Sequence, residues 1–360
     1  MTPLRSLSMA AVAVALLTTT TGFTGGHRPS PSWQLSETGV TARLRGLAAV
    51  SDRVAWAAGS GGTVLRTVDG GRSWQRVDPP GTQELQFRDI EAFDAERAVA
   101  LTIGEGEQSR IYTTADGGRS WTETFRNEDP RAFYDCITFL DRRHGLALSD
   151  PVDGRFRILA TADGGRTWQV RPTTGMPEAL PGEFAFAASG TCLVTAGDGA
   201  RGRAWFATGG AAQARVFATA DGGRTWSATT TPVPSGPSAG VYSLAFRDAR
   251  HGIAVGGDYA TPATAPDAAA VTRDGGRRWS TAVTPPGEYR SGVAWLPGSW
   301  RPGSRAAAVA VGPTGSDSTP DGGRTWVRFD TGSFDAVDCA PRRGCWASGE
   351  QGRVAVLRRH

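Results

Sequence analysis

One short motif recurs along the 360-residue chain and constrains its fold more than any other feature. It reads TVDGGRSW at Thr67–Trp74 and TADGGRTW at both Thr161–Trp168 and Thr219–Trp226. Six copies share the pattern T-x-D-G-G-R-x-W, and their aspartates are Asp69, Asp116, Asp163, Asp221, Asp274 and Asp321. Successive spacings of 47, 47, 58, 53 and 47 residues have the size of one supersecondary unit, so we expect a repeat protein.

The segments that separate these boxes also align with one another. Each contains an apolar run, a polar turn, a second apolar run and a short strand leading into the next box, as in ITFLDRRHGLALSDPVDG and LAFRDARHGIAVGGDY. There are seven such segments, and in the fourth, FAFAASGTCLVTAGDG, we expect FAFAAS and TCLVTAG to be the first and second strands. Short β-rich runs separated by turns predict a four-stranded meander in each repeat.

The seventh segment has no box, because the chain ends at GRVAVLRRH. The stretch PSWQLSE at Pro31–Glu37 resembles RSWQRVD and places Trp33 in register with the box tryptophans. We therefore predict an all-β, seven-bladed β-propeller in which N- and C-terminal strands complete one blade, since this pairing removes open sheet edges. Six or eight blades are the alternatives.

The N-terminus has the pattern of a secretory signal peptide. Arg5 precedes a compact apolar run, Met9–Leu17, which is too short to span a bilayer, and small residues follow. We expect residues 1–26 to be removed on export, leaving 27–360 as a single propeller with no stable membrane span. No cysteine follows the run for lipid attachment, and no A-x-A sequence fixes the cleavage site. A disordered N-terminal tail is the alternative.

Four cysteines in an exported chain indicate disulfides. Cys339 and Cys345 enclose APRRG, which reads as a tight hairpin that a bridge could close. Cys136 and Cys192 are the remaining candidates, but the sequence does not show whether they approach each other. No C-x-x-C redox motif and no metal-binding spacing of cysteine and histidine is present.

The residues of the box suit a tight chain reversal. An aspartate side chain accepts hydrogen bonds from nearby backbone N–H groups, and two glycines permit positive φ angles. A serine or threonine hydroxyl supports the same turn, and the tryptophan begins the fourth strand as an apolar anchor. One copy departs from this pattern, because Arg278 replaces the hydroxyl residue and weakens the hydrogen bonding of that turn.

The box resembles the Asp-box, or BNR repeat, of sialidases, sortilin-type receptors and some plant-cell-wall hydrolases. With its flanking strands, the chain resembles most closely the photosystem II stability and assembly factor family, whose bacterial relatives include exported proteins. The resemblance covers essentially the whole mature chain. It implies that the box is structural and lies opposite the ligand face, and that the partner is a protein or peptide.

Several kinds of binding and catalysis require residues or motifs that this chain does not contain. The chain contains no lysine, which excludes lysine Schiff bases and phosphate-loop lysines. GDGARG, with Gly197, Gly199 and Gly202, matches a dinucleotide fingerprint but leads into another strand rather than a helix. His144 and His251 occupy the same turn of two repeats, so we expect both to be turn residues. The net charge of +4 is carried by dispersed arginines, whereas a nucleic-acid binder usually has a dense basic stripe. We therefore expect no cofactor, no metal and no nucleic-acid partner.

Glycoside hydrolysis is the alternative enzyme function, because the box occurs in sialidases. The sialidase F/Y-R-I-P motif is absent, and FRIL at Phe156–Leu159 is in register with the third strands. An ordinary glycosidase needs two carboxylates beside the scissile bond. Acidic loop residues could supply them, namely Glu105, Glu107, Asp150 and Asp153.

The candidate binding residues lie where the repeats stop agreeing, at the start of each first strand. Arginine and tyrosine stand out there, and both are favoured in recognition sites. The positions are Arg45, Arg88, Asp89, Tyr134, Asp135, Glu183, Tyr242, Arg290 and Asp335, with Tyr259 and Arg201 in longer loops on the same face. A solvated rim is the alternative interpretation. We expect an exported, monomeric, non-enzymatic scaffold that binds a protein or peptide, with carbohydrate as the other ligand class.

Overall fold

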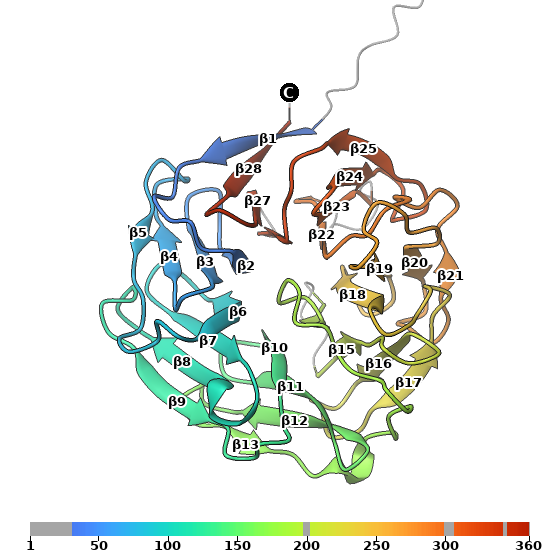
Figure 1. Ribbon diagram of the computed structural model, residues 1–360, viewed down its shortest axis with the longest axis horizontal. Coiled ribbons are helices and arrows are strands. Elements are labelled where there is room, and N and C mark those ends of the chain that lie inside the picture. Colours follow the sequence, from blue (N-terminus) through green and yellow to red (C-terminus); the bar gives the residue numbers. More distant parts are fainter. Residues whose placement is uncertain (1–30, 197–201, 299–305, 341–343, 360) are drawn as a thin grey trace, which may run out of the picture.

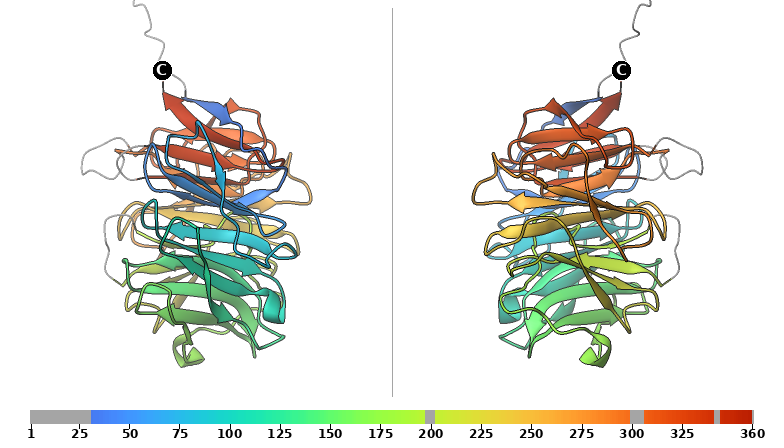
Figure 2. Two further views of the ribbon diagram at one scale, coloured as in Figure 1. Left: turned by 90° about the vertical axis from the view of Figure 1, so that its left-hand side faces the viewer. Right: turned by 90° about the vertical axis from the view of Figure 1, so that its right-hand side faces the viewer.

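Seven four-stranded antiparallel sheets form a ring in the computed structural model, which describes residues 31–196, 202–298, 306–340 and 344–359 (Figure 1). Seen from the side, the sheets stack around the axis of a thick disc (Figure 2). The expected signal peptide, residues 1–26, and Arg201 lie outside the described residues. The predicted all-β, seven-bladed propeller is confirmed.

Six blades follow the chain from the innermost strand outward. Blade 1 contains β2 (Leu44–Ala49), β3 (Ala55–Gly59), β4 (Val64–Thr67) and β5 (Gln75–Arg76). Blade 2 contains β6 (Gln86–Ala92), β7 (Ala98–Ile103), β8 (Arg110–Thr114) and β9 (Thr122–Arg126), with the 3-10 helix η1 (Gly106–Gln108). Blade 3 contains β10 (Tyr134–Phe139), β11 (Gly145–Val152), β12 (Arg155–Thr161) and β13 (Gln169–Val170), followed by η2 (Thr173–Gly175).

The next three blades have the same order. Blade 4 contains β14 (Leu193–Thr195), β15 (Ala204–Ala207), β16 (Arg215–Thr219) and β17 (Ser227–Thr230). Blade 5 contains β18 (Ala239–Phe246), β19 (Gly252–Asp258), β20 (Ala269–Thr272) and β21 (Ser280–Thr281). Blade 6 contains β22 (Gly292–Trp295), β23 (Ala308–Gly312), β24 (Gly315–Thr319) and β25 (Val327–Asp330).

Blade 7 joins the two ends of the chain. It contains β26 (Ala336–Cys339), β27 (Cys345–Ser348) and β28 (Val354–Arg359), and its outer strand is β1 (Pro31–Ser36). β1 runs antiparallel to β28 with Trp33 opposite Leu357. Both ends of the described chain therefore meet at one point of the rim (Figure 1), and the predicted closure is confirmed.

The hydrophobic core is divided among the seven interfaces between adjacent blades, and each interface receives one tryptophan from the start of a fourth strand. Trp121 packs against blade 1, for example, and its indole N–H donates to the carbonyl of Val77 at 2.7 Å. Trp33 occupies the corresponding place between blades 6 and 7. The other interfaces contain Trp74, Trp168, Trp226, Trp279 and Trp326. Burial of these large rings holds neighbouring blades together.

The first box shows how the repeated turn is held. Ser73 donates its backbone N–H and its hydroxyl to the two Asp69 oxygens at 3.0 and 2.7 Å. The Thr67 hydroxyl donates to Asp69 at 2.9 Å and accepts the N–H of Gly71 at 3.0 Å. Gly70 and Gly71 have φ angles of 82° and 80°, which favour glycine. At Arg278 the backbone N–H still reaches Asp274, at 3.0 Å, but no hydroxyl is there to donate.

Two disulfides are present, which is typical of chains that fold in an oxidising, extracytoplasmic environment. Cys339 and Cys345 close the hairpin between β26 and β27, as expected. Cys136 on β10 pairs with Cys192, which immediately precedes β14, so this bridge links blade 3 to blade 4. Within the described ranges, no helix has the length and apolar character needed to cross a membrane.

The expected strand register was wrong in blade 4. The innermost strand is β14, within the TCLVTAG run that was expected to be second, and β15 takes the second place. The FAFAAS run lies outside the four-stranded sheet, where Phe184 forms only an isolated bridge with Gly209. The apolar residues of this run alternate as they do in a strand, but Phe186 is buried against other aromatic rings and does not belong to a blade. Figure 1 shows this yellow-green segment, between β13 and β15, entering the centre of the ring.

Candidate functional site

The loops of each blade emerge on two opposite faces of the disc. The boxes join third to fourth strands, so one face, here called the box face, contains all six. The opposite face contains the connections from each outer strand to the next inner strand and is called the mouth. A pocket of about 370 Å³ opens there. Its lining residues are Arg43, Arg45, Phe186, Ala187, Ala188, Tyr242, Tyr259, Pro262, Tyr289, Ser291, Pro313 and Asp335.

One side of the mouth pocket is aromatic. The Tyr242 ring stacks on Phe186 with centroids 3.8 Å apart and meets Tyr289 edge-on at 4.8 Å. The Tyr242 hydroxyl donates to the carbonyl of Ser238 at 2.6 Å, which fixes the ring, and burial raises the pKa of this phenol. Tyr259 is 57% exposed at the edge of this cluster. The pocket therefore offers a rigid apolar wall with one accessible ring.

The other side of the pocket is charged. Arg43 forms a two-pronged contact with Asp335, with nitrogen–oxygen distances of 2.8 and 2.7 Å, and these hydrogen bonds raise the pKa of Arg43. Arg45 lies beside them, with its Nε 3.8 Å from Asp335 Oδ1. That nitrogen is buried and has no hydrogen-bond partner within the part of the chain that the structure describes, and desolvation lowers the pKa of Arg45. Arg45 is thus the donor in the mouth that a ligand could satisfy.

A β-bulge aims several candidate side chains at the centre of the ring. The register of the innermost strand shifts by one residue in blades 1, 2, 3 and 5. Such a shift places the extra residue outside the ladder and redirects its side chain. The extra residues are Arg45, Arg88, Asp135 and Tyr242. Arg88 donates to the carbonyl of Ala187 at 2.9 Å and so ties blade 2 to residues 184–188 of the FAFAAS run, here called the central segment.

Two expected binding residues, Tyr134 and Arg290, are fully buried. Each lies one position before the residue that faces the mouth in its blade. Tyr134 packs between blades 2 and 3. The Arg290 guanidinium binds Asp317 at 2.6 and 2.7 Å and also donates to the Tyr289 carbonyl. Burial dominates the electrostatics of Asp317 and raises its pKa despite this contact. Neither side chain reaches a ligand in this arrangement.

Glu183 and Asp89 also serve internal contacts. Glu183 is buried and accepts hydrogen bonds from Thr208 and from Nε of Arg215, at 2.6 and 2.8 Å, which anchors the central segment to blade 4. Asp89 accepts the backbone N–H of Ile137 at 2.7 Å and so links blade 2 to blade 3. Burial, with the nearby Glu91 carboxylate, raises the pKa of Asp89.

More carboxylates line the interior below the mouth. Burial and the neighbouring Asp338 raise the pKa of Glu91 to about 8. Burial likewise raises the pKa of Asp150 to about 7, and burial beside Asp150 raises that of Asp135. Asp338 and Asp150 accept the backbone N–H groups of Ala49 and Ala185, at 2.7 and 2.8 Å. These contacts between neighbouring segments make the carboxylates part of the scaffold.

Sequence reasoning missed Arg43, Phe186 and Tyr289, yet the repeat lengths contained a signal for part of this site. The two longest box spacings, 58 and 53 residues, precede the boxes of blades 4 and 5. Of the extra length, one part forms the central segment with Phe186, and another forms the loop after β19 with Tyr259 and Pro262. Insertions in a repeat map to loops on one face, often the binding face.

The mouth pocket combines aromatic rings with arginine side chains and contains few acidic groups. Its lining residues include one carboxylate, Asp335, and that group is held by Arg43. A glycosidase needs two carboxyl groups about 5–10 Å apart. Among the residues that the structure describes, no group of three or more His, Cys, Asp and Glu side chains could hold a metal ion.

No protein-family model and no curated protein matches the sequence. Solved structures do match. "YCF48 bound to D1 peptide" has a TM-score of 0.61 at 15% identity, covering 90% of this chain and 96% of that one. YCF48 from Cyanidioschyzon merolae has a TM-score of 0.60 at 15% identity, covering 91% and 98%. The WD40 propeller domain of Doa1 has a TM-score of 0.57 at 13% identity, covering 92% and 98%. At these identities the similarity establishes the fold, a β-propeller.

Proposed function

We propose that this protein is an exported, non-enzymatic scaffold that binds a peptide segment of a partner protein in the mouth pocket. The observation that carries the proposal is the pairing of the aromatic wall, Tyr242 with Tyr259, and the unsatisfied Nε of Arg45 in one pocket. Aromatic and arginine side chains in a concave, partly desolvated surface dominate the energetics of protein recognition. The similarity to a propeller solved with a bound peptide supports the same function.

The ligand in this proposal is an extended peptide that places an apolar side chain on the Tyr242 wall and an acceptor oxygen on Arg45. The cavity of about 370 Å³ suits a short stretch of chain, since ligand sites fall within about 300–1,000 Å³. The N-terminal signal pattern and the two disulfides support a place outside the cytoplasm. The proposed scaffold works as a monomer.

The test is selection of peptides from a displayed random library on the wild-type protein, followed by fluorescence polarisation with the selected sequences. Tyr259→Ala and Arg45→Ala should each weaken binding by about tenfold or more, as expected for central interface residues. Leu35→Ala is the matched control, because Leu35 on β1 is 58% exposed and lies on the outer rim. Equal binding by all three variants would overturn the proposal.

Carbohydrate hydrolysis remains the competing function, and the same protein preparation distinguishes it. Wild-type protein incubated with a panel of glycosides should release no sugar, because the pocket lacks a second carboxylate. Release of sugar that Asp335→Asn abolishes would assign catalysis to the mouth and remove the non-enzymatic part of the proposal.

A further inference from the structure

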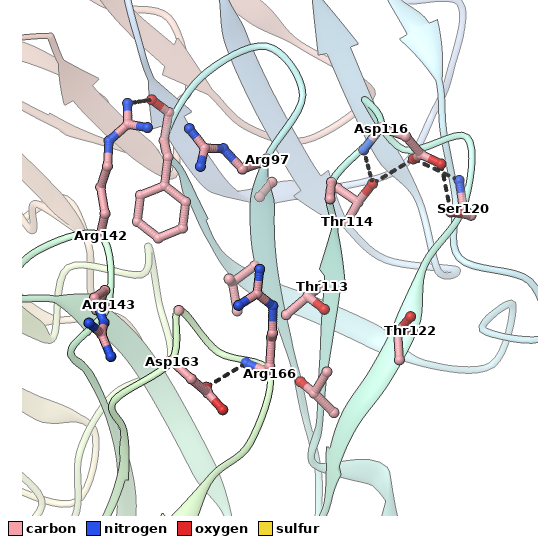
Figure 3. Close-up of a pocket in the computed structure, with 16 residues that line it drawn as sticks. Arg97, Thr113, Thr114, Asp116, Ser120, Thr122, Arg142, Arg143, Asp163 and Arg166 are labelled. Carbon is pink, nitrogen blue, oxygen red and sulfur yellow. Dashed lines mark hydrogen bonds between the residues drawn. The ribbon is translucent and has the colours of Figure 1, made fainter.

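A second concave surface lies on the box face, between blades 2 and 3, and it is larger than the mouth pocket. Its volume is about 710 Å³. β7, β8 and β9 of blade 2 form one side, while the turn Leu140–His144 and the box of blade 3 form the other (Figure 3). We call this surface the inter-blade groove. Four arginines line it, namely Arg97, Arg142, Arg143 and Arg166.

Two of these arginines share one carboxylate. Arg97 binds Asp94 at 2.6 Å, and Arg142 reaches the same carboxylate at 3.5 Å while donating to the carbonyl of Phe93 at 3.2 Å. Figure 3 shows the Arg142 guanidinium held at that carbonyl. A single negative charge thus serves two guanidinium groups, and the pair keeps a net positive charge at one end of the groove.

The guanidinium groups of the other two arginines have no carboxylate within 4 Å among the described residues. The Arg143 side chain donates to the carbonyl of Ala162, at 3.4 Å. In three other boxes the equivalent of Arg166 folds back and donates to the carbonyl of its own box aspartate, as Arg119 does to Asp116 at 2.9 Å. The Arg166 side chain makes no such bond and runs up the groove, away from the Asp163 carboxylate (Figure 3).

The remaining polar groups of the groove favour an anion. The two box carboxylates, Asp116 and Asp163, accept the hydroxyl groups and N–H groups of their own turns, so their oxygens are already engaged. The hydroxyls of Thr113 and Thr122 line the groove and make no hydrogen bond within the described part of the chain. The Arg166 guanidinium and these two hydroxyl groups therefore line a common space and have no acceptor of their own among the described residues.

The equivalent turn and box of blade 5 provide an internal comparison. This turn has Ala249 where blade 3 has Arg142. Arg250 corresponds to Arg143 and donates to the carbonyl of Arg273 at the same distance, 3.4 Å. Arg277 corresponds to Arg166. The repeat thus supplies two equivalent arginines in both blades, whereas Arg142 and its contact with the Asp94 carboxylate belong to the inter-blade groove.

We propose that the inter-blade groove binds the phosphate groups of a polyphosphorylated ligand. A guanidinium group matches a phosphate with two parallel hydrogen bonds, and hydroxyl donors can satisfy further phosphate oxygens. Arg166, Arg143 and the Arg97–Arg142 pair all line the groove, so successive phosphates of one ligand can contact different arginines. The nearby box carboxylates oppose weakly charged anions, so a multiply charged ligand is favoured. This site is separate from the mouth and does not depend on its function.

Isothermal titration with sodium tripolyphosphate tests the proposal on the intact mature protein. Arg143→Ala/Arg166→Ala should bind tripolyphosphate at least about tenfold more weakly than wild type, because it loses two charge-assisted contacts. Arg250→Ala/Arg277→Ala removes the same charge from the equivalent positions of blade 5 and should change affinity less than about twofold. All four side chains are exposed or near the surface, so both variants should keep the wild-type urea midpoint.

Absence of wild-type binding, or equal losses in both double variants, would overturn the proposal, since equal losses indicate general electrostatics. Sedimentation with vesicles containing phosphatidylglycerol then distinguishes the source of the phosphate. Binding to tripolyphosphate alone indicates a soluble ligand. Binding to vesicles that is lost in Arg143→Ala/Arg166→Ala and kept in the control indicates phosphate presented by a lipid headgroup.

Discussion

The box turns and the mouth use loops of the same blades in opposite ways. In a box such as Thr219–Trp226, the carboxylate of Asp221 receives donors from its own turn, and the tryptophan packs on the preceding blade. At the mouth, the side chains come from different blades, and one donor, Nε of Arg45, has no partner. The repeated box residues therefore form hydrogen bonds within their own turns. The residues that differ between blades form a surface that can bind a ligand.

The largest expected effect concerns Arg290, which the sequence placed among the binding residues and the structure buries. Arg290→Met should lower the free energy of unfolding by about 3–5 kcal/mol, because it leaves Asp317 buried without its partner. Urea unfolding of the variant measures this loss. A change below about 1 kcal/mol, together with weaker peptide binding, would move Arg290 back to the binding surface.

The two disulfides should differ in strength because they close chain loops of different length. Removing Cys136–Cys192, with a sequence separation of 56, should cost about 4 kcal/mol by the loop-entropy relation. Removing Cys339–Cys345, with a separation of 6, should cost about 2 kcal/mol. Urea unfolding of C136A/C192A and C339A/C345A measures both. Equal losses would show that loop length does not set the contribution of either bridge.

Two boxes whose aspartates accept different numbers of hydrogen bonds test the structural role of the box. Asp221→Ala should cost about 2 kcal/mol, because Asp221 accepts four hydrogen bonds. Asp274→Ala should cost about 1 kcal/mol, since Arg278 supplies only its N–H and Thr272 the other bond. Both variants should bind selected peptides as the wild type does. Lost binding at an unchanged urea midpoint would make the box part of the site.

The smallest expected effect is the pH dependence of stability. It should distinguish the box carboxylates from the buried carboxylates of the interior. Hydrogen bonds from Ser73 and Ser120 lower the pKa of Asp69 and Asp116 from 3.8 to about 2. The folded state holds these carboxylates charged, so stability falls as the pH drops from about 4 to about 2. Burial raises the pKa of Glu91 from 4.5 to about 8. The folded state then retains a proton that the unfolded chain loses, so stability also falls as the pH rises from about 4.5 toward 8.

Glu91→Gln separates the low-pH decline from the high-pH decline, because it removes a titrating carboxyl group of the interior and leaves the boxes intact. Urea midpoints between pH 2 and pH 9 should show a shallower decline above pH 5 in this variant and an unchanged decline below pH 4. Parallel profiles for the variant and the wild type would show that Glu91 does not titrate in the folded protein as described.

The sequence was sufficient to predict the blade count and the closure by Trp33, because both follow from counting repeats and matching one box position. The register within blade 4 was not predictable, since FAFAAS alternates like a strand while its rings pack in the mouth. The orientation of the side chains at the mouth was not predictable either. The β-bulge of blade 3 redirects Asp135, so its neighbour Tyr134 was selected although it is buried. Arg290 was selected because arginine is favoured in recognition sites, whereas its guanidinium is buried against Asp317.

In our proposal the ligand binds in the mouth, and the boxes hold the blades together. Hydrogen–deuterium exchange with and without a selected peptide distinguishes the two faces. We expect slower exchange in the central segment 184–188, in the loop 258–265 and at 289–291, with no change in the six box turns. Protection of the box turns, with unchanged exchange at the mouth, would contradict it.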